Sequence, residues 1–339
     1  MLEKPALEDA EIVACLRDQY RLEIVEVTFL PLGADANTAV YRVVAADQTP
    51  YFLKLRSGAF DEASVLLPRF LHEQGIPQII APIATTSGQL WGHLDALDGF
   101  KVLLSPFIEG QNGWDVDLSD RQWIEFGAAL KAVHIAQVPP TLISRVPRET
   151  YSPKWREIVR GFQAQVEQET FADPISAELA ALLKDKRPVI DDLISRAERL
   201  GQMLQSNPPE TVICHADLHM GNLLITATGD FYIVDWDTPI LAPKERDLMF
   251  IGGGIGRLDS AQEIALFYQG YGQTQIDPVA LAYYRYERII EDIAAYCQQL
   301  FLSDEGGQDR EQGLHQLSGQ FLPDDVIEVA YRTDRSGIS

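Results

Sequence analysis

The hydrophobic and polar positions of the first hundred residues predict one helix followed by an antiparallel meander of three strands. Apolar side chains recur at helical spacing over residues 7–20, so this stretch is expected to form an amphipathic helix. Three segments rich in β-branched and aromatic residues follow, at 22–30, 39–45 and 51–55. Because only short runs of turn residues separate them, we expect consecutive strands to pair in an antiparallel way.

The same reading predicts a second helix and two further strands. Residues 61–74 carry an apolar face and end before Gly75, which is typical of a helix with a glycine at its C-terminal end. Strand-like segments follow at 90–94 and 100–108. The turn-like sequence at 109–113 then predicts a hinge.

Beyond this hinge the pattern becomes mainly helical. Ser119 and Gln122 have the spacing of a capping box, and apolar residues at helical spacing follow them. Short strands at 211–214 and 231–234 each precede a polar cluster, and the tail from Ser303 to Gln312 is polar and expected to be loose. Further helices are predicted at 154–169, 175–205, 260–271 and 277–302.

These elements predict an α+β protein of two lobes. The N-terminal lobe, residues 1–108, combines a small antiparallel sheet with one key helix, and the larger C-terminal lobe, residues 109–339, is mainly helical. Two lobes also fit the length of 339 residues, because single cores stop growing near roughly 250–300 residues.

Composition and charge narrow the function. With 28 Lys+Arg against 50 Asp+Glu the net charge is −22, which argues against a nucleic-acid partner and is compatible with a cationic small molecule. No stretch reads as a signal peptide or membrane span. The three cysteines are scattered and form no short-spaced zinc or redox pair; they are Cys15, Cys214 and Cys297. We therefore expect a soluble, cytoplasmic protein without a membrane partner.

The most informative stretch runs from strand 211–214 through a polar loop to strand 231–234. Asp217 and Asn222 lie five residues apart, and Asp235 follows Asn222 by thirteen. Phosphoryl transfer needs a carboxylate that orients the attacking hydroxyl and hard oxygen ligands that hold Mg²⁺ against nucleotide phosphates. Two aspartates and an asparagine on one strand–loop–strand unit can supply the orienting carboxylate and two oxygen ligands for Mg²⁺.

His-x-Asp-x-x-x-x-Asn followed by a strand and Asp resembles the catalytic loop of the protein-kinase-like fold, in its aminoglycoside phosphotransferase and choline kinase branch. His219 stands where protein kinases carry Lys, and Asp-Trp-Asp replaces their Asp-Phe-Gly, so the small-molecule branch is the better match. The resemblance implies that Asp217 is the catalytic base and that Asn222 and Asp235 hold Mg²⁺, with ATP as co-substrate.

Lys54 supports this interpretation from the N-terminal lobe. It lies in the middle of a strand among apolar neighbours, where an unpaired cation is costly to bury. In the resembling fold such a lysine binds the α- and β-phosphates and pairs with a helix glutamate, for which Glu62 is the candidate. A lysine that snorkels from an edge strand is the alternative for Lys54, and Asp61 and Glu73 compete with Glu62.

The nucleotide is expected to contact two further stretches. The loop between the first two strands occupies the position of a phosphate-covering loop, although it has a single glycine; its candidates are Gly33, Asp35, Asn37 and Thr38. By analogy with the fold, backbone groups at the hinge bind the adenine edge; they belong to Ser105, Phe107 and Ile108.

Three longer blocks, at 151–160, 235–254 and 283–295, resemble a group of this family that phosphorylates spectinomycin. They imply a hydroxyl acceptor of the aminocyclitol class, which is cationic and calls for carboxylates and flat apolar faces. Asp247 matches an aspartate that supports the catalytic-loop backbone. The candidate acceptor residues are Asp237, Glu287, Glu291 and Asp292 for charge, and Trp114, Tyr151, Trp155 and the Tyr283 to Tyr286 cluster for aromatic faces. The alternative for each is an ordinary solvated or core helix residue, which is favoured for all of them except Asp237, the neighbour of the Asp235 site.

Two alternatives remain at this level. The first is a kinase of the same fold that acts on a metabolite such as homoserine, choline or a thiosugar. The second is a catalytically silent nucleotide-binding protein, against which the set Lys54, Asp217, Asn222 and Asp235 argues. The sequence leaves the oligomeric state open.

Overall fold

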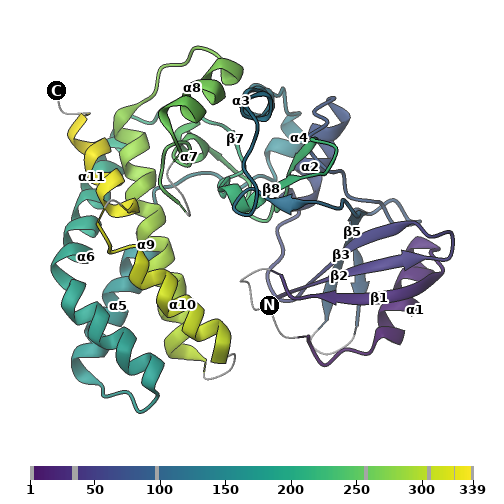
Figure 1. Ribbon diagram of the computed structural model, residues 1–339, viewed down its shortest axis with the longest axis horizontal. Coiled ribbons are helices and arrows are strands. Elements are labelled where there is room, and N and C mark those ends of the chain that lie inside the picture. The colour runs from purple at the N-terminus through teal and green to yellow at the C-terminus, as the bar shows by residue number, and fades with distance from the viewer. Residues whose placement is uncertain are drawn as a thin grey trace. The chain divides into compact units, whose positions relative to one another are not determined.

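The computed structural model describes residues 4–32, 37–95, 99–255, 259–303, 307–323 and 325–336 (Figure 1). The chain forms two compact units, one made of Met1–Pro147 with Met220–Pro239 and the other of Arg148–His219 with Ile240–Ser339. This division places residues 220–239, which include Asn222 and Asp235, in the same unit as the N-terminal sheet. The lobe boundary expected at residue 108 stays a prediction.

The first unit contains a five-stranded antiparallel sheet in the order β1-β2-β3-β5-β4, so the predicted meander of the first three strands is confirmed. Helix α1 (Asp9–Tyr20) packs against it, and the Tyr20 hydroxyl donates to the Val102 carbonyl at 3.0 Å. Tyr41 and Leu53 are among the core side chains between helix and sheet. The strands are β1 (Ile24–Leu30), β2 (Thr38–Ala45), β3 (Pro50–Arg56), β4 (Gly92–Leu94) and β5 (Phe100–Pro106).

The rest of this unit surrounds a second, three-stranded sheet. Helix α3 (Asp120–His134) begins with the predicted capping box, and its Phe126 ring packs edge-on against Phe231 at 6.3 Å. The stretch at 109–113, which was expected to be a hinge, contains a short strand, β6. This strand pairs with β8, Gln111 opposite Ile225 and Asn112 opposite Leu224. The remaining elements are α2 (Ala63–Glu73), β6 (Gln111–Asn112), α4 (Pro140–Ile143), the 3-10 turn η1 (Met220–Asn222), β8 (Leu223–Ile225) and β9 (Phe231–Ile233).

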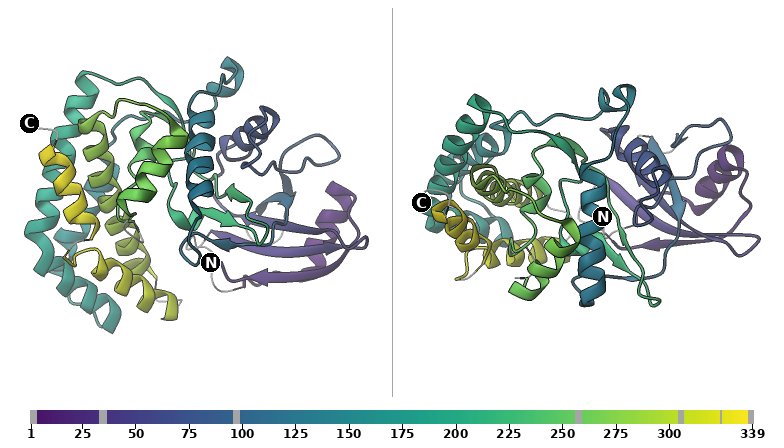
Figure 2. Two further views of the ribbon diagram at one scale, coloured as in Figure 1. Left: turned by 45° about the horizontal axis from the view of Figure 1, so that its top comes forward. Right: turned by 90° about the horizontal axis from the view of Figure 1, so that it is seen from above.

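The second unit is built on two long helices that lie side by side, α6 (Pro174–Ser206) and α9 (Pro278–Leu302), as Figures 1 and 2 show. Each begins with proline in its first turn and an aspartate N-cap. Helices α5 (Lys154–Gln168) and α11 (Val326–Ser336) pack against α9.

The expectation of a loose tail at 303–312 is wrong from Gly307 onward, because helix α10 (Gly307–Gly319) begins there. Its Arg310 is buried and donates to the Asp173 carboxylate at 2.6 Å and to the Leu300 carbonyl at 2.9 Å. A polar segment is thus fixed by one buried cation and its partners.

Two short strands and two helices carry the catalytic-loop side of this unit. Strand β7 (Val212–Cys214) pairs with β10 (Ile240–Ala242), and α7 (Glu245–Leu248) and α8 (Ala261–Tyr271) follow. Within the described residues, no helix combines the length and the apolar character needed to cross a membrane.

Candidate functional site

Two cations of strand β3 form a cluster with two carboxylates that follow strand β9 in the first unit. Lys54 Nζ lies 2.8 Å from Asp235 Oδ1 and 2.7 Å from Asp237 Oδ1. Arg56 and Lys54 are two residues apart and share one face of the strand, and Arg56 Nη1 lies 2.8 Å from Asp237 Oδ2. Burial alone would lower the pKa of Lys54, but the two carboxylates outweigh it and raise that pKa.

This cluster corrects two expectations. Glu62 does not pair with Lys54, because it forms an ion pair with Arg145 at 2.7 Å while Lys54 is neutralised by the two aspartates. Asp237 was expected to bind the acceptor, yet both of its oxygens accept from cations of β3. Its expected role is therefore corrected to pairing with the two cations of β3.

The backbone brings the two predicted Mg²⁺ ligands together. The amide of Val234 donates to the Asn222 carbonyl at 2.9 Å, so Asn222 lies beside the residue that precedes Asp235. The Trp236 indole is buried and donates to the Ile233 carbonyl at 3.1 Å. Asp235 itself has a left-handed φ of 63°, a conformation that is uncommon for non-glycine residues and that aspartate enters more easily than most.

Trp114 lies against the glycine that follows the catalytic loop. It is 51% exposed, and a Cβ atom added to Gly221 would stand 2.6 Å from its Cζ3 atom. The Trp114 amide donates to Asn112 Oδ1 at 2.8 Å. The expected aromatic face therefore lies at the residue directly before Asn222.

The first part of the candidate catalytic loop, residues 215–219, belongs to the second unit and is supported by a buried aspartate. Asp247 Oδ2 accepts from the His215 amide at 2.9 Å, and Asp247 Oδ1 accepts from the Ala216 amide at 2.7 Å. Asp247 is fully buried, and Ala216 has a φ of 74°. The structural role predicted for Asp247 is confirmed.

Asp217 is held by Arg288, a residue of α9 that the sequence analysis missed. Arg288 Nη1 donates to Asp217 Oδ1, and His219 Nε2 lies 3.6 Å from Asp217 Oδ2. Burial alone would raise the pKa of Asp217, but Arg288 and His219 hold it well below its ordinary value. The sequence contained a sign of this arginine: Arg288 stands four residues before Asp292 on the predicted helix, a spacing at which opposite charges pair. Arg56 was missed in the same way, two residues after Lys54.

Three carboxylates of α9 that were expected to contact the acceptor are paired with arginines. Glu287 Oε2 lies 2.5 Å from Arg156 Nη1 inside the unit, and burial raises the pKa of Glu287 to about 7. Because a built-in cation already neutralises Glu287, its expected role is corrected to a structural one. The other two contacts are Asp292 with Arg288 at 3.0 Å and Glu291 with Arg246 at 3.5 Å.

Most of the expected aromatic faces are core residues. Tyr283, Tyr284 and Tyr286 are fully buried, and Tyr151 packs edge-on against Tyr283 at 5.3 Å. These four residues are therefore corrected from acceptor-binding candidates to packing residues. The Trp155 ring is covered by the Lys154 ammonium at 4.0 Å.

Not all residues expected to contact the nucleotide belong to the described part of the chain. Gly33 and Asp35 lie outside the described residues. The Asn37 carbonyl accepts from the Ser57 amide at 2.9 Å, and Thr38 begins β2. Ser105 lies in β5 opposite Phe52. The Phe107 amide donates to the Pro50 carbonyl at 3.3 Å, and Ile108 follows it.

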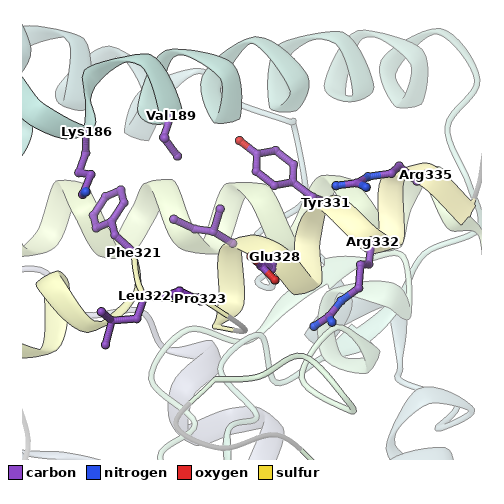
Figure 3. A pocket seen from close by; sticks show the side chains of 10 residues that line it. Lys186, Val189, Phe321, Leu322, Pro323, Glu328, Tyr331, Arg332 and Arg335 are labelled. Carbon is purple, nitrogen blue, oxygen red and sulfur yellow. The ribbon is translucent and has the colours of Figure 1, made fainter.

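Figure 3 shows a cleft of about 570 Å³ elsewhere in the second unit. Lys186 and Val189 of α6 line it together with Phe321, Leu322 and Pro323 and residues of α11. None of the predicted site residues contributes to it.

Comparisons with known proteins agree on one family. The family described as "Phosphotransferase enzyme family" (APH) matches residues 28–284. The fold is similar to spectinomycin phosphotransferase, APH(9)-Ia, in complex with ADP and spectinomycin, with 37% identity, a TM-score of 0.88, and 98% of this chain and 100% of that chain covered. The AMP-bound complex of that enzyme gives 36% identity and a TM-score of 0.83, with 96% and 98% covered.

A more distant likeness shows the fold alone. Choline kinase from Streptococcus pneumoniae is 13% identical, with a TM-score of 0.52 and 97% of this chain and 98% of that chain covered. None of the curated protein sequences matches the chain.

Proposed function

Because the chain belongs to the phosphotransferase enzyme family, we propose that it transfers the γ-phosphate of ATP to a hydroxyl of spectinomycin. It has the protein-kinase-like fold of that family and is a small-molecule kinase that uses ATP. The observation that carries the proposed acceptor is 37% identity over 98% of this chain to an enzyme bound to ADP and spectinomycin. Similarity over the whole length includes the regions that bind the acceptor as well as those that bind the nucleotide.

Asp217 is the residue we assign to the acceptor hydroxyl. The hydroxyl donates to the carboxylate, and its oxygen forms a bond to the γ-phosphorus. The bond from that phosphorus to the bridging oxygen breaks, its electron pair leaves with ADP, and the hydroxyl proton passes to Asp217. The depressed pKa of Asp217 keeps the carboxylate ionised but makes it a weak base, which suits a loose transition state with late proton transfer.

Lys54 and Arg56 are the residues we assign to the nucleotide phosphates. Each is paired with an aspartate through a hydrogen bond of 2.7–2.8 Å, and nucleotide phosphates are acceptors of the same kind. Exchange of these partners would release the Asp235 carboxylate. For adenine we keep Ser105 and Ile108, since the Phe107 amide already donates to Pro50.

The donor set fits Mg²⁺. Asn222 and Asp235 supply amide and carboxylate oxygens, the hard ligands this ion prefers, and the Asn222–Val234 hydrogen bond keeps them adjacent. Asp235 already attracts a cation, Lys54, at 2.8 Å. When bound, Mg²⁺ would neutralise charge on the nucleotide phosphates.

Glu291 is the α9 carboxylate that best suits an ammonium group of the acceptor. Its contact with Arg246 is long, at 3.5 Å, and its side chain is 27% exposed. Trp114 supplies an exposed aromatic face next to Gly221. An acidic group and a flat apolar surface are the features that a cationic ring compound requires.

The test is an ADP-release assay with Mg·ATP against spectinomycin, aminoglycosides, homoserine, choline and a thiosugar, with mass spectrometry of the products. We expect one phosphate on spectinomycin. In the variant Asp217→Ala, transfer should be nearly abolished while calorimetry still detects Mg·ATP binding, because Asp217 acts on the acceptor. Turnover of a metabolite alone would overturn the proposed acceptor, and equal loss of nucleotide affinity and turnover would overturn the role of Asp217.

A further inference from the structure

Arg288 is fixed at the catalytic carboxylate by contacts on several sides. Its Nη1 donates to Asp217 Oδ1, and its Nε lies 3.0 Å from Asp292 Oδ1. Its guanidinium also lies over the Phe250 ring, 5.8 Å from the ring centre. A guanidinium is planar and rigid, so contacts in several directions determine its orientation.

The partners of Arg288 are themselves held in place. Asp292 lies one turn further along α9, and its Oδ2 accepts from Gln320 Nε2 at 3.2 Å. The Phe250 ring meets the His219 ring edge-on at 6.4 Å. Residues of the helical unit therefore hold Arg288 in place, and Arg288 in turn holds the Asp217 carboxylate.

The charges at this place depend on Arg288. Asp217 and Asp292 are both partly buried carboxylates, and Arg288 contacts each of them. Burial raises the pKa of Asp292, whereas Arg288 acts in the opposite direction. Without Arg288, two carboxylates would share one low-dielectric region, and like charges at short range repel strongly.

We propose that Arg288 is a positioning residue for phosphoryl transfer: it holds Asp217 Oδ1 so that Oδ2 receives the hydrogen bond of the acceptor hydroxyl. This inference rests on the role proposed for Asp217. A carboxylate on a loop can rotate about its side-chain bonds, and one oxygen held by a rigid guanidinium removes that freedom. Orientation of this kind is costly to lose, since a displacement near 1 Å costs roughly 10²-fold in rate.

The test compares Arg288→Met and Arg288→Lys with the matched control Arg285→Met, which removes another buried arginine of α9. Arg285 donates to the Met249 and Ile251 carbonyls and not to Asp217. For Arg288→Met we expect kcat to fall about 10²-fold, with KM for ATP unchanged within about threefold. Arg288→Lys keeps the charge but not the rigid fork, so it should recover only a small part of kcat, while Arg285→Met should keep kcat per folded molecule.

A double-mutant cycle separates positioning from folding. If Arg288 acts only through Asp217, then Arg288→Met should cost nothing further in an Asp217→Asn background, where the buried carboxylate is also neutralised. Because transfer by both Asp217→Asn variants is expected to be very slow, their residual rates are measured by mass spectrometry of the phosphorylated product.

The outcomes distinguish the two proposals. Any acceptor that the wild-type enzyme phosphorylates serves for the comparison, so failure of the spectinomycin assignment is seen in the wild type alone. The inference is overturned by a kcat of Arg288→Met within threefold of the wild type, by an equal loss in Arg285→Met, or by additive losses in the cycle. A loss specific to kcat, with only partial rescue by lysine and no further loss beside Asp217→Asn, supports it, whereas full rescue by lysine would show that the charge alone is needed and would overturn it.

Discussion

Replacing Asp247 by Ala removes the support of the catalytic-loop backbone. Two buried hydrogen bonds are lost, from His215 at 2.9 Å and from Ala216 at 2.7 Å, and both amides lose a charged acceptor. Hydrogen bonds to charged groups contribute about 1.5–3 kcal/mol each, so the expected loss in the free energy of unfolding is roughly 3–6 kcal/mol. Asp247→Asn keeps one acceptor oxygen and should lose about half of this.

The loss can be converted to a melting temperature. An unfolding entropy of about 2.1 cal/mol/K per residue gives about 0.7 kcal/mol/K for 339 residues. The expected decrease for Asp247→Ala is therefore roughly 4–8 °C. Because the backbone amides of His215 and Ala216 lead directly to Asp217, kcat should fall as well, by about 10²-fold for a displacement near 1 Å.

Differential scanning calorimetry and steady-state kinetics measure both effects. Asp185→Ala is the matched control, since Asp185 is 71% exposed and forms an ion pair with its neighbour Lys186; a surface pair of this kind contributes about 0–1 kcal/mol. The reasoning would be refuted if Asp247→Ala melted within about 2 °C of the wild type, or if Asp247→Asn were as damaging as Asp247→Ala.

Two further predictions concern a glycine and a helix cap. Gly221→Ala should shift the Trp114 fluorescence but lower the melting temperature little, because the exposed indole can move. Gly110→Ala should lower the melting temperature more, since its Cβ would stand 2.6 Å from the Ile225 carbonyl oxygen, a backbone atom. Equal melting temperatures of the two variants would contradict this. Arg310 and the Ser176 amide lower the pKa of Asp173 from 3.8 to about 2, so its contribution to stability is present above pH 3.8 and is lost as the pH falls through about 2. Urea unfolding across this range should show a smaller pH dependence for Asp173→Asn, and parallel curves would count against it.

The elements that the sequence predicted share a strong local pattern. Strands β1 to β3 alternate or carry β-branched residues, and α3 begins with a capping box, so neighbouring residues alone determine them. Strands β8 and β10 were not predicted; they have three residues each, as do the predicted strands β7 and β9, so length alone does not separate the two pairs. The part of helix α10 that was expected to be loose, residues 307–312, is polar and is anchored by the buried Arg310, while the buried Leu314 and Leu317 lie beyond that part.

The candidate site likewise has features that depend on local sequence and features that depend on the packed fold. The spacing of Asp217, Asn222 and Asp235 is a local property of one strand–loop–strand unit, so the sequence indicated it directly. Ion-pair partners are not local: Lys54 and Asp235 are 181 residues apart, and Arg288 and Asp217 are 71 apart. Which carboxylate meets which cation depends on the packed fold, and for that reason the partner of Lys54 was predicted wrongly and Arg288 was missed.

The paired charges change how an acidic protein recognises a cationic acceptor. A net charge of −22 suggests carboxylates waiting for an ammonium group, yet Glu287 and Asp292 each lie within 2.5–3.0 Å of an arginine. An acceptor that displaced these arginines would leave a buried guanidinium uncompensated, which costs more than one new ion pair returns. In the proposed reaction, recognition of a cationic acceptor would therefore fall to a less tightly paired carboxylate of this unit, Glu291, whose contact with Arg246 is 3.5 Å long. Overall acidity then serves attraction at long range, while selectivity comes from a few groups.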